Sequence, residues 1–240
     1  MSCYGRGVAT VERPEVPDAE RVAPDLWLLR GRPRNAFNVY VMGDVLVDAG
    51  TRHARRRIMR AVRDVPISAH VLTHGHLDHM GASHAICQAR QIPLMCGEGD
   101  VALAESGGRL GLEAKPRPVR IQHRLMAGEG HRVDRVLREG DEVAGFEVLE
   151  VPGHSPGHLA FWRAPDRVLV LGDVVFGLKL PLGRPGLQLP PALLTPDPET
   201  NLASARRLAE LEPEVVCFGH GPVLRDGQAF VDFCRRAPRG

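Results

Sequence analysis

Residues 71–81 read VLTHGHLDHMG and place four metal-ligand side chains, His74, His76, Asp78 and His79, within six residues. Imidazole nitrogens and carboxylate oxygens are the preferred ligands of Zn²⁺ and other borderline first-row metals. His74 and His76 occupy alternate positions, so an extended backbone directs both to one side. Asp78 and His79 follow where the chain turns and reach a neighbouring point. The stretch therefore predicts two adjacent metal sites rather than a polar surface loop.

Three later segments end apolar, β-branched runs with further ligand side chains. The segment VPGHSPGH contains His154, VLVLGDVVF contains Asp173, and VVCFGHGP contains His220. Loops at the carboxyl ends of neighbouring strands meet at one rim of a sheet, so we expect these side chains to converge on the first group. Together they supply five histidines and two aspartates. This set suffices for two metal ions bridged by a carboxylate and a water.

The order H-x-H-x-D-H, lone His, lone Asp, lone His resembles the metallo-β-lactamase superfamily, and the match runs from about Asn38 to Pro222. The resemblance implies two ligand trios and a bridge, which are His74, His76 and His154; Asp78, His79 and His220; and Asp173. It also implies a fold of the α/β (α+β) class, a four-layer αββα sandwich with two sheets between helices. The implied cofactors are two divalent metal ions, zinc first, with iron or manganese as alternatives.

The implied reaction is hydrolysis of a carbonyl compound. A metal pair lowers the pKa of bound water and supplies hydroxide at neutral pH, so no serine or cysteine nucleophile is needed. We expect a bridging hydroxide to attack a small-molecule ester, thioester or lactone, with Asp78 and Asp173 as the catalytic carboxylates. We expect replacement of His76 or Asp173 by Ala to abolish this activity.

Two further residues are expected to support the ligands. Asp48 closes the apolar run 45–48 beside the predicted rim. It is expected to orient the ligand loop by hydrogen bonds from behind, to cap the next helix together with Thr51, or to do both. His158 lies four residues past His154 and is expected to support the site rather than bind metal, because the seven ligands already complete two sites.

The substrate stays open. The motifs GHSPGH and GDVVF resemble the thioester hydrolase glyoxalase II and its small bacterial relatives. Only about twenty residues follow His220, whereas glyoxalase II binds glutathione with an added helical domain. Lactonases of the superfamily share the ligand set. An alternative from another reaction class is a persulfide dioxygenase, which shares H-x-H-x-D-H but uses one iron held by two histidines and an aspartate.

Length and composition set broader limits. The 240 residues, 43% of them hydrophobic, suit a polar arm at 1–20 and a single domain at 21–240. The net charge of +2 gives no reason to expect nucleic acid or membrane as a partner. The five cysteines form no C-x-x-C pair, and no secretory leader pattern is present, so we expect a reduced, cytoplasmic setting.

Two other segments invite interpretation. Residues 53–65 predict a helix with five arginines, which we interpret as a solvated face because no aromatic residues are interleaved with them. The apolar, proline-rich segment Phe176–Thr195 follows Asp173 directly. It is expected to be a packed surface loop, a wall of a substrate pocket, or a contact in a homodimer.

Overall fold

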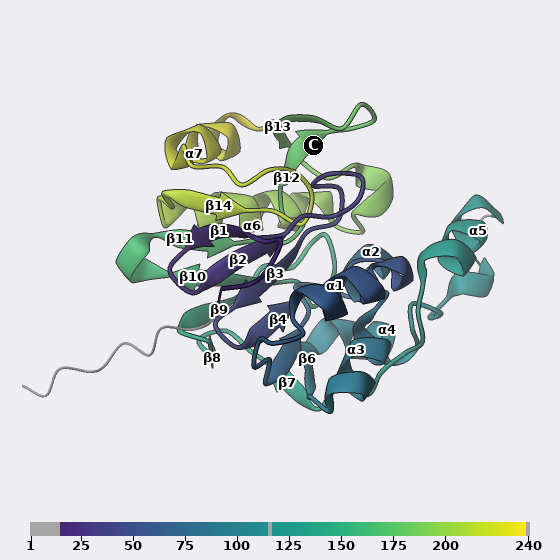
Figure 1. Ribbon diagram of the computed structural model, residues 1–240. Helices are drawn as coiled ribbons and strands as arrows, with labels where there is room; N and C mark the ends of the chain where they lie inside the picture. Colours follow the sequence, from purple (N-terminus) through teal and green to yellow (C-terminus); the bar gives the residue numbers. More distant parts are fainter. Residues whose placement is uncertain (1–14, 115–116, 239–240) are drawn as a thin grey trace, which may run out of the picture.

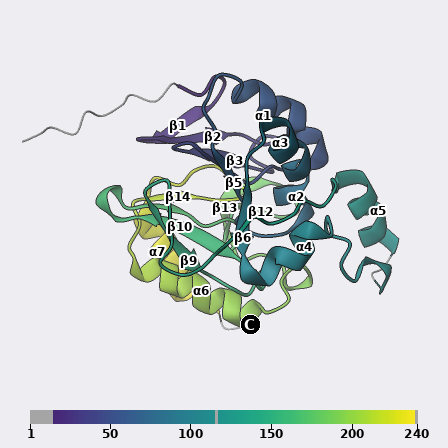
Figure 2. The same cartoon turned by 90° about the horizontal axis from the view of Figure 1, so that it is seen from below.

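The computed structural model describes residues 15–114 and 117–238, which form two large β-sheets packed face to face between layers of helices (Figures 1 and 2). This arrangement confirms the predicted four-layer αββα architecture. Most of the expected N-terminal arm, residues 1–14, lies outside the described residues. The first strand begins at Glu20, and the predicted domain boundary there stays a prediction.

The first sheet has seven strands in sequence order. They are β1 (Glu20–Ala23), β2 (Leu26–Leu29), β3 (Val39–Met42), β4 (Val45–Val47), β5 (Ala69–Val71), β6 (Leu94–Gly97) and β7 (Arg135–Leu137). Strands β1 to β4 pair antiparallel, and β4 to β7 pair parallel. The sequence predicts one strand over 22–30, but a turn at Pro24 and Asp25 divides it. Proline has no N–H for the ladder, and Asp25 has a φ of 52°.

The second sheet has five strands in the order β14-β11-β10-β9-β8. They are β8 (Glu142–Val143), β9 (Phe146–Glu150), β10 (Leu159–Arg163), β11 (Val168–Val170) and β14 (Val215–Cys217). Only β11 and β14 pair parallel. The chain between them forms the hairpin β12 (Phe176–Lys179) and β13 (Arg184–Gln188), the short η5 (Ala192–Leu194) and α6 (Pro198–Glu210).

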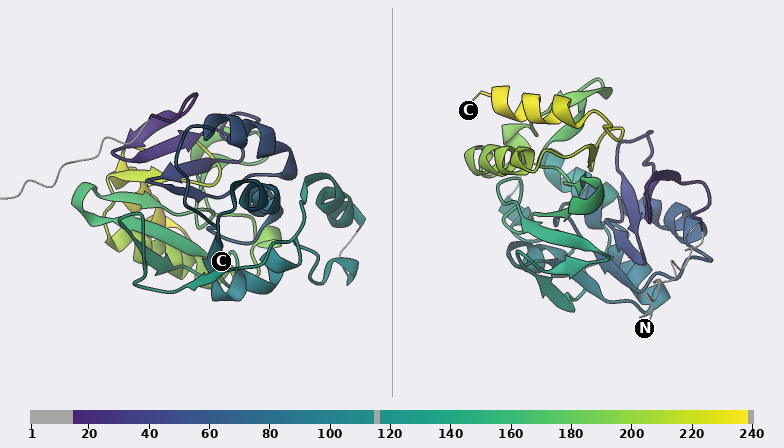
Figure 3. Two further views of the ribbon diagram at one scale, coloured as in Figure 1. Left: turned by 60° about the horizontal axis from the view of Figure 1, so that its bottom comes forward. Right: turned by 90° about the vertical axis from the view of Figure 1, so that its left-hand side faces the viewer.

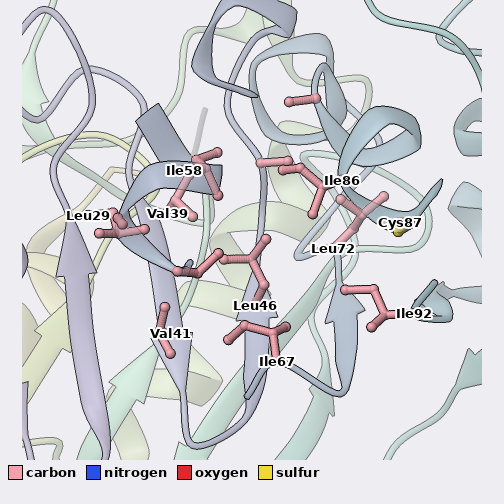
Figure 4. Close-up of a cluster of buried hydrophobic side chains, with 14 of the residues drawn as sticks. Leu29, Val39, Val41, Leu46, Ile58, Ile67, Leu72, Ile86, Cys87 and Ile92 are labelled. Atoms are coloured by element: carbon pink, nitrogen blue, oxygen red, sulfur yellow. The ribbon is translucent and has the colours of Figure 1, made fainter. Parts of the chain in front are cut away.

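Successive side chains of a strand point to opposite faces of its sheet, so the strands contribute apolar side chains to the core on both faces. On β3, Val39 and Val41 face the outer helices, whereas Tyr40 and Met42 join the core between the sheets. Figure 4 shows Ile58 of α1 (Arg55–Ala61) and Ile86 of α3 (Ser83–Arg90) in the outer cluster. On the opposite side, α6 and α7 (Gly227–Arg236) cover the second sheet. Each fully buried large apolar side chain contributes about 1.5–3 kcal/mol of transfer free energy.

Residues 97–114 and 117–140 hold short elements at one side of the molecule (Figures 1 and 3). They are η2 (Glu98–Asp100), α4 (Val101–Glu105), η3 (Leu112–Ala114) and α5 (Arg117–Met126), before β7. Helix α5 carries exposed Ile121 and Leu125. The remaining short elements are η1 (Arg52–Ala54), α2 (Leu77–Met80) and η4 (Ala164–Asp166).

The segment Phe176–Thr195 combines buried and exposed apolar side chains. Phe176 and Leu178 are buried, but Leu182 at the hairpin tip and Leu193 in η5 are 71% and 96% exposed. The sequence predicts a loop, but the segment contains the β12–β13 hairpin. Within the described ranges, no helix has the length and apolar character needed to cross a bilayer.

Candidate metal centre

The structure brings all seven predicted ligand residues to one rim, where loops from both sheets meet. Their side chains form three overlapping groups, in each of which one potential ligand atom per residue lies within 4.8 Å of the others. The groups are His74, His76 and His154; His74, His79 and Asp173; and Asp78, His79 and His220. Two groups coincide with the trios that the resemblance implies, and Asp173 groups with one histidine from each. That these residues bind metal stays a prediction.

Asp173 lies at the centre of the cluster. Its Oδ2 is 3.0 Å from His220 Nε2, 3.3 Å from His79 Nε2, 3.5 Å from His154 Nε2 and 3.8 Å from His74 Nε2. The Nε2 atoms of His79 and His154 and the Oδ1 of Asp173 are buried without an aligned hydrogen bond. Leaving such atoms unpaired costs free energy. Divalent metal ions would satisfy them, so the donor set fits such ions.

Four imidazoles are held from behind through Nδ1, which turns each Nε2 toward the cluster. His79 Nδ1 donates to Asp48 at 2.8 Å, and His74 Nδ1 donates to Thr73 Oγ1 at 3.1 Å. His154 Nδ1 is 3.2 Å from Thr195 Oγ1, and His220 Nδ1 contacts the Ala36 carbonyl. Such partners fix the tautomer and the ring orientation of a metal-binding histidine.

Asp48 organises the rim from behind the ligands. Its carboxylate accepts hydrogen bonds from the Thr73 N–H and the Thr73 hydroxyl, both at 2.8 Å, and from His79. The residue is buried and has a φ of 59°. The helix-cap alternative does not describe it, because η1 starts at Arg52 with Thr51 at its N-cap. Asp48 thus touches His79 directly and His74 through Thr73.

His158 supports the turn that presents Asp173. Its Nε2 accepts the Asp173 backbone N–H at 3.2 Å, and it belongs to none of the three ligand groups. Gly172 makes the turn with a φ of 58°, and a Cβ there would overlap His158 and Thr73. A Cβ at Gly219 would overlap Asp173 and His79. Glycine at both positions lets the two loops approach this closely.

Asp100 is a site residue that the sequence analysis missed. Buried in η2, it accepts hydrogen bonds from the Gly75 N–H at 2.8 Å, Ser155 Oγ at 2.6 Å and the Gly157 N–H at 3.1 Å. It therefore ties the loop of His74 and His76 to the loop of His154. Its position just after β6, on the rim used by the other strands, is the signal that could have found it.

Two more supports come from elsewhere in the chain. Residues 153–157, GHSPG, match the G-x-S-x-G pattern of serine hydrolases, but Ser155 is buried and donates to Asp100.

Asn38 donates to the carbonyls of Phe218 and Gly221, and Tyr40 also donates to Phe218. Both side chains come from β3 or the residue before it and hold the loop that carries His220. Their separation in sequence hides this role.

Charges within the cluster divide the histidines into two kinds. Burial and neighbouring imidazoles lower the pKa of His74, and burial lowers the pKa of His154 to about 4. Burial opposes protonation of His79 and His220 as well, but Asp173 outweighs it and raises both pKa values, that of His220 to about 10. Imidazolium charges likewise lower the pKa of the Asp173 carboxyl against its burial. Without metal, His79 and His220 are the cations that balance the carboxylates.

Comparison with known proteins agrees with this geometry. The chain is 32% identical over 199 residues to "Probable metallo-hydrolase YflN" of Bacillus subtilis, covering 74% of this chain and 75% of that protein. It is 30% identical over 193 residues to "Hydroxyacylglutathione hydrolase GloC" of Haemophilus influenzae, covering 76% and 82%. TTHA1623, solved in a di-iron-bound form, superposes with a TM-score of 0.60 at 29% identity, covering 87% and 94%.

A family model described as the metallo-beta-lactamase superfamily matches residues 32–220, a span that includes all seven clustered residues. The superfamily relatives and the His/Asp cluster together indicate divalent metal ions, and the di-iron form of TTHA1623 leaves the choice between zinc and iron open. The chain belongs to the metallo-β-lactamase superfamily.

Proposed function

We propose that this protein is a metal-dependent hydrolase that cleaves an ester, thioester or lactone bond of a small molecule. The observation that carries the proposal is the central Asp173, within 3.8 Å of four imidazoles drawn from both ligand trios. Two bound divalent metal ions would lower the pKa of a water and polarise the substrate carbonyl. The first trio would be His74, His76 and His154, and the second Asp78, His79 and His220, with Asp173 between them.

The chain's own contribution is to hold these donors in place. Asp48, Thr73 and Thr195 fix three imidazoles from behind, so that no rotation of those rings is needed when substrate binds. Asp78 contacts His220 at 3.3 Å, and its pKa is lowered despite burial by that histidine. Asp78 is therefore an anion at neutral pH and can accept a proton or bind a cation.

The relatives support a hydrolase more than the iron-dependent redox alternative. One relative is named a metallo-hydrolase and another is named for hydrolysis of hydroxyacylglutathione. We therefore place acyl esters and thioesters first among the substrates to test.

The test compares metal-loaded wild-type protein with the variants His76→Ala and Asp173→Ala on a panel of esters, thioesters and lactones. His84→Ala is the matched control, because this half-buried histidine lies outside the three groups. We expect the wild-type protein to hydrolyse at least one substrate. Both site variants should lose this activity by about a thousandfold or more, and the control should keep it in full. Full activity of Asp173→Ala would overturn the proposal.

The metal content provides a second measurement. Protein expressed without added metal should retain about two divalent ions per chain, and both site variants should retain fewer. A single iron per chain with oxygen consumption on persulfides would replace the hydrolase proposal by the redox alternative.

A further inference from the structure

Two adjoining cavities lie beside the metal centre, between the β2–β3 connection and the segment η1–α1. The first has a volume of about 460 Å³ and the second about 380 Å³. Arg32, Arg57 and Arg60 line both cavities. Arg34 lines the first and Arg56 the second. We call these five residues and the two cavities the arginine cleft.

The five arginines have no carboxylate partner within the described part of the chain. A sixth, Arg30, also lines the first cavity, but it pairs with Glu20. The one carboxylate in the lining is that of Asp18, and His53 lies at the second cavity. Some other described arginines do pair with carboxylates, such as Arg163 with Asp166 and Arg138 with Glu98. The cleft therefore places five arginines around two cavities that have one lining carboxylate, that of Asp18.

Arg57 is the one half-buried arginine of the cleft, whereas Arg56 and Arg60 on the same helix are exposed. Its guanidinium donates to the Leu29 carbonyl at 3.2 Å. Burial and the nearby Arg32 lower its pKa. Keeping like charges together in a partly buried place costs free energy that a bound anion would recover. The planar fork of arginine suits phosphate oxygens in particular.

The cleft leads to the metal centre through Phe37 and Thr51, which line the second cavity. The Phe37 ring lies edge-on to the His220 ring, with 5.7 Å between centroids. Thr51 begins the turn that packs against Gly81, and the Gly81 N–H donates to the Gly50 carbonyl at 2.8 Å. Gly81 is two residues past His79, so the lining of the second cavity contacts the loops that carry His79 and His220.

We propose that the arginine cleft binds the phosphate-bearing part of the substrate, so that the acyl group to be hydrolysed is carried by a compound with a diphosphate or nucleotide portion. This inference rests on the proposed function and specifies its substrate class. The opposing charges are few, because Asp18 is the lone carboxylate in the described lining. The volumes suit a small molecule.

A nucleic-acid duplex is a less suitable occupant. Such a partner needs an extended basic surface, whereas these arginines converge on two cavities. The net charge of the whole chain is only +2. The five arginines thus surround two cavities and do not follow an extended surface.

The binding test titrates ADP and pyrophosphate, by calorimetry, into metal-loaded wild-type protein, Arg57→Ala/Arg60→Ala and Arg235→Ala. Arg235 is an exposed arginine of α7 outside the cleft and provides the matched control. We expect binding to wild type and control, and a loss of about tenfold or more in the cleft variant. Asp173→Ala should still bind ADP, which separates the cleft from chelation of the metals by phosphate.

The kinetic arm compares an acyl thioester of coenzyme A with an uncharged alkyl thioester. In the cleft variant, KM for the phosphate-bearing thioester should rise about tenfold or more, with kcat/KM for the uncharged one unchanged. Absence of ADP binding to wild type, or equal binding to all variants, would overturn the inference. The inference would also be overturned if duplex DNA or anionic vesicles bound to wild type but not to the cleft variant, and if ADP did not displace them. If ADP binds but the protein hydrolyses neither thioester, the result counts against the proposed function and not against anion binding by the cleft.

Discussion

Among single residues, Asp48 connects the two ligand trios, through His79 on one side and Thr73 on the other. Three donors converge on this buried carboxylate, so its loss would leave each of them unpaired. Its φ of 59° also restricts what can replace it, because alanine is strained there whereas asparagine tolerates that region. Asp48→Asn is therefore the variant that isolates the carboxylate charge.

We expect Asp48→Asn to weaken metal binding by about ten- to a hundredfold, because His79 loses the carboxylate that accepts the hydrogen bond from its Nδ1. Metal retained after dialysis against a graded series of chelator concentrations measures this. Asp232→Ala, on the exposed side of α7, should bind metal as wild type does. Equal metal retention in Asp48→Asn would show that the carboxylate does not tune the ligands.

Metal uptake should release protons and strengthen as pH rises. His79 and His220 have raised pKa values, that of His220 about 10, so both are protonated in the metal-free protein at neutral pH. A metal needs the neutral imidazole and must displace those protons. Apparent affinity should therefore increase with pH up to about 10. Calorimetry in buffers of different ionisation enthalpy measures the protons, and zero release near pH 7.5 would contradict this assignment.

At the scale of elements, the hairpin β12–β13 and η5 link the site to an apolar surface. Phe176 lies against the His154 and His220 rings, with centroids 6.3 and 4.8 Å away. Thr195, at the far end of the same segment, holds His154. The exposed Leu182 and Leu193 lie between these two anchors. The segment can therefore present apolar side chains toward an acyl group without moving its two ends.

Replacing 180–187 by a short glycine linker should raise KM for acyl substrates by about tenfold, because apolar contact area is lost while both anchors remain. The metal content should not change, since no residue of the three ligand groups is removed. Steady-state kinetics with short and long acyl chains measure this. Equal kinetics with both chain lengths would show that the hairpin is no substrate wall, and a change in oligomeric state alone would assign it to a subunit contact.

Sequence reasoning identified the seven residues that cluster at the rim, but it missed several of the residues that hold them in place. His74, His76 and His79 form a local pattern, and the lone ligands each follow an apolar run, so short-range signals suffice. Asp100 and Thr195 act across long separations, on Gly75 and His154, and no local pattern marks them. The four layers could be expected because the ligand motifs resemble those of the metallo-β-lactamase superfamily, which implies that fold. The split of β1 from β2 was missed although Pro24, which cannot donate to the ladder, marks the turn with Asp25.

At the scale of the whole molecule, the candidate centre joins the two sheets. His74, His76, Asp78 and His79 follow β5 of the first sheet, whereas His154, Asp173 and His220 follow strands of the second. Direct contacts also cross the rim, such as the Leu159 N–H to the Thr73 carbonyl at 2.8 Å. Bound metal would thus add links between two halves that already pack face to face.

Chelation should therefore destabilise the whole fold rather than one loop. Metal at about a thousand times its Kd stabilises the native state by about 4 kcal/mol. For a chain of this size, that corresponds to a fall in Tm of about 8–16 °C on metal removal. Differential scanning calorimetry with and without chelator measures the fall. Asp173→Ala should show little response to chelator, and an unchanged Tm in wild type would mean that metal does not link the sheets.

The parallel pairing of β11 with β14 has a consequence for biosynthesis. As the ribosome adds residues in order, the first trio is complete once His154 has emerged, but the second waits for His220. The loop that carries His220 is placed by β14, which joins the sheet after the hairpin and α6 have been made. A nascent chain halted before β14 would still lack His220, so the second of the two trios is completed only late in synthesis.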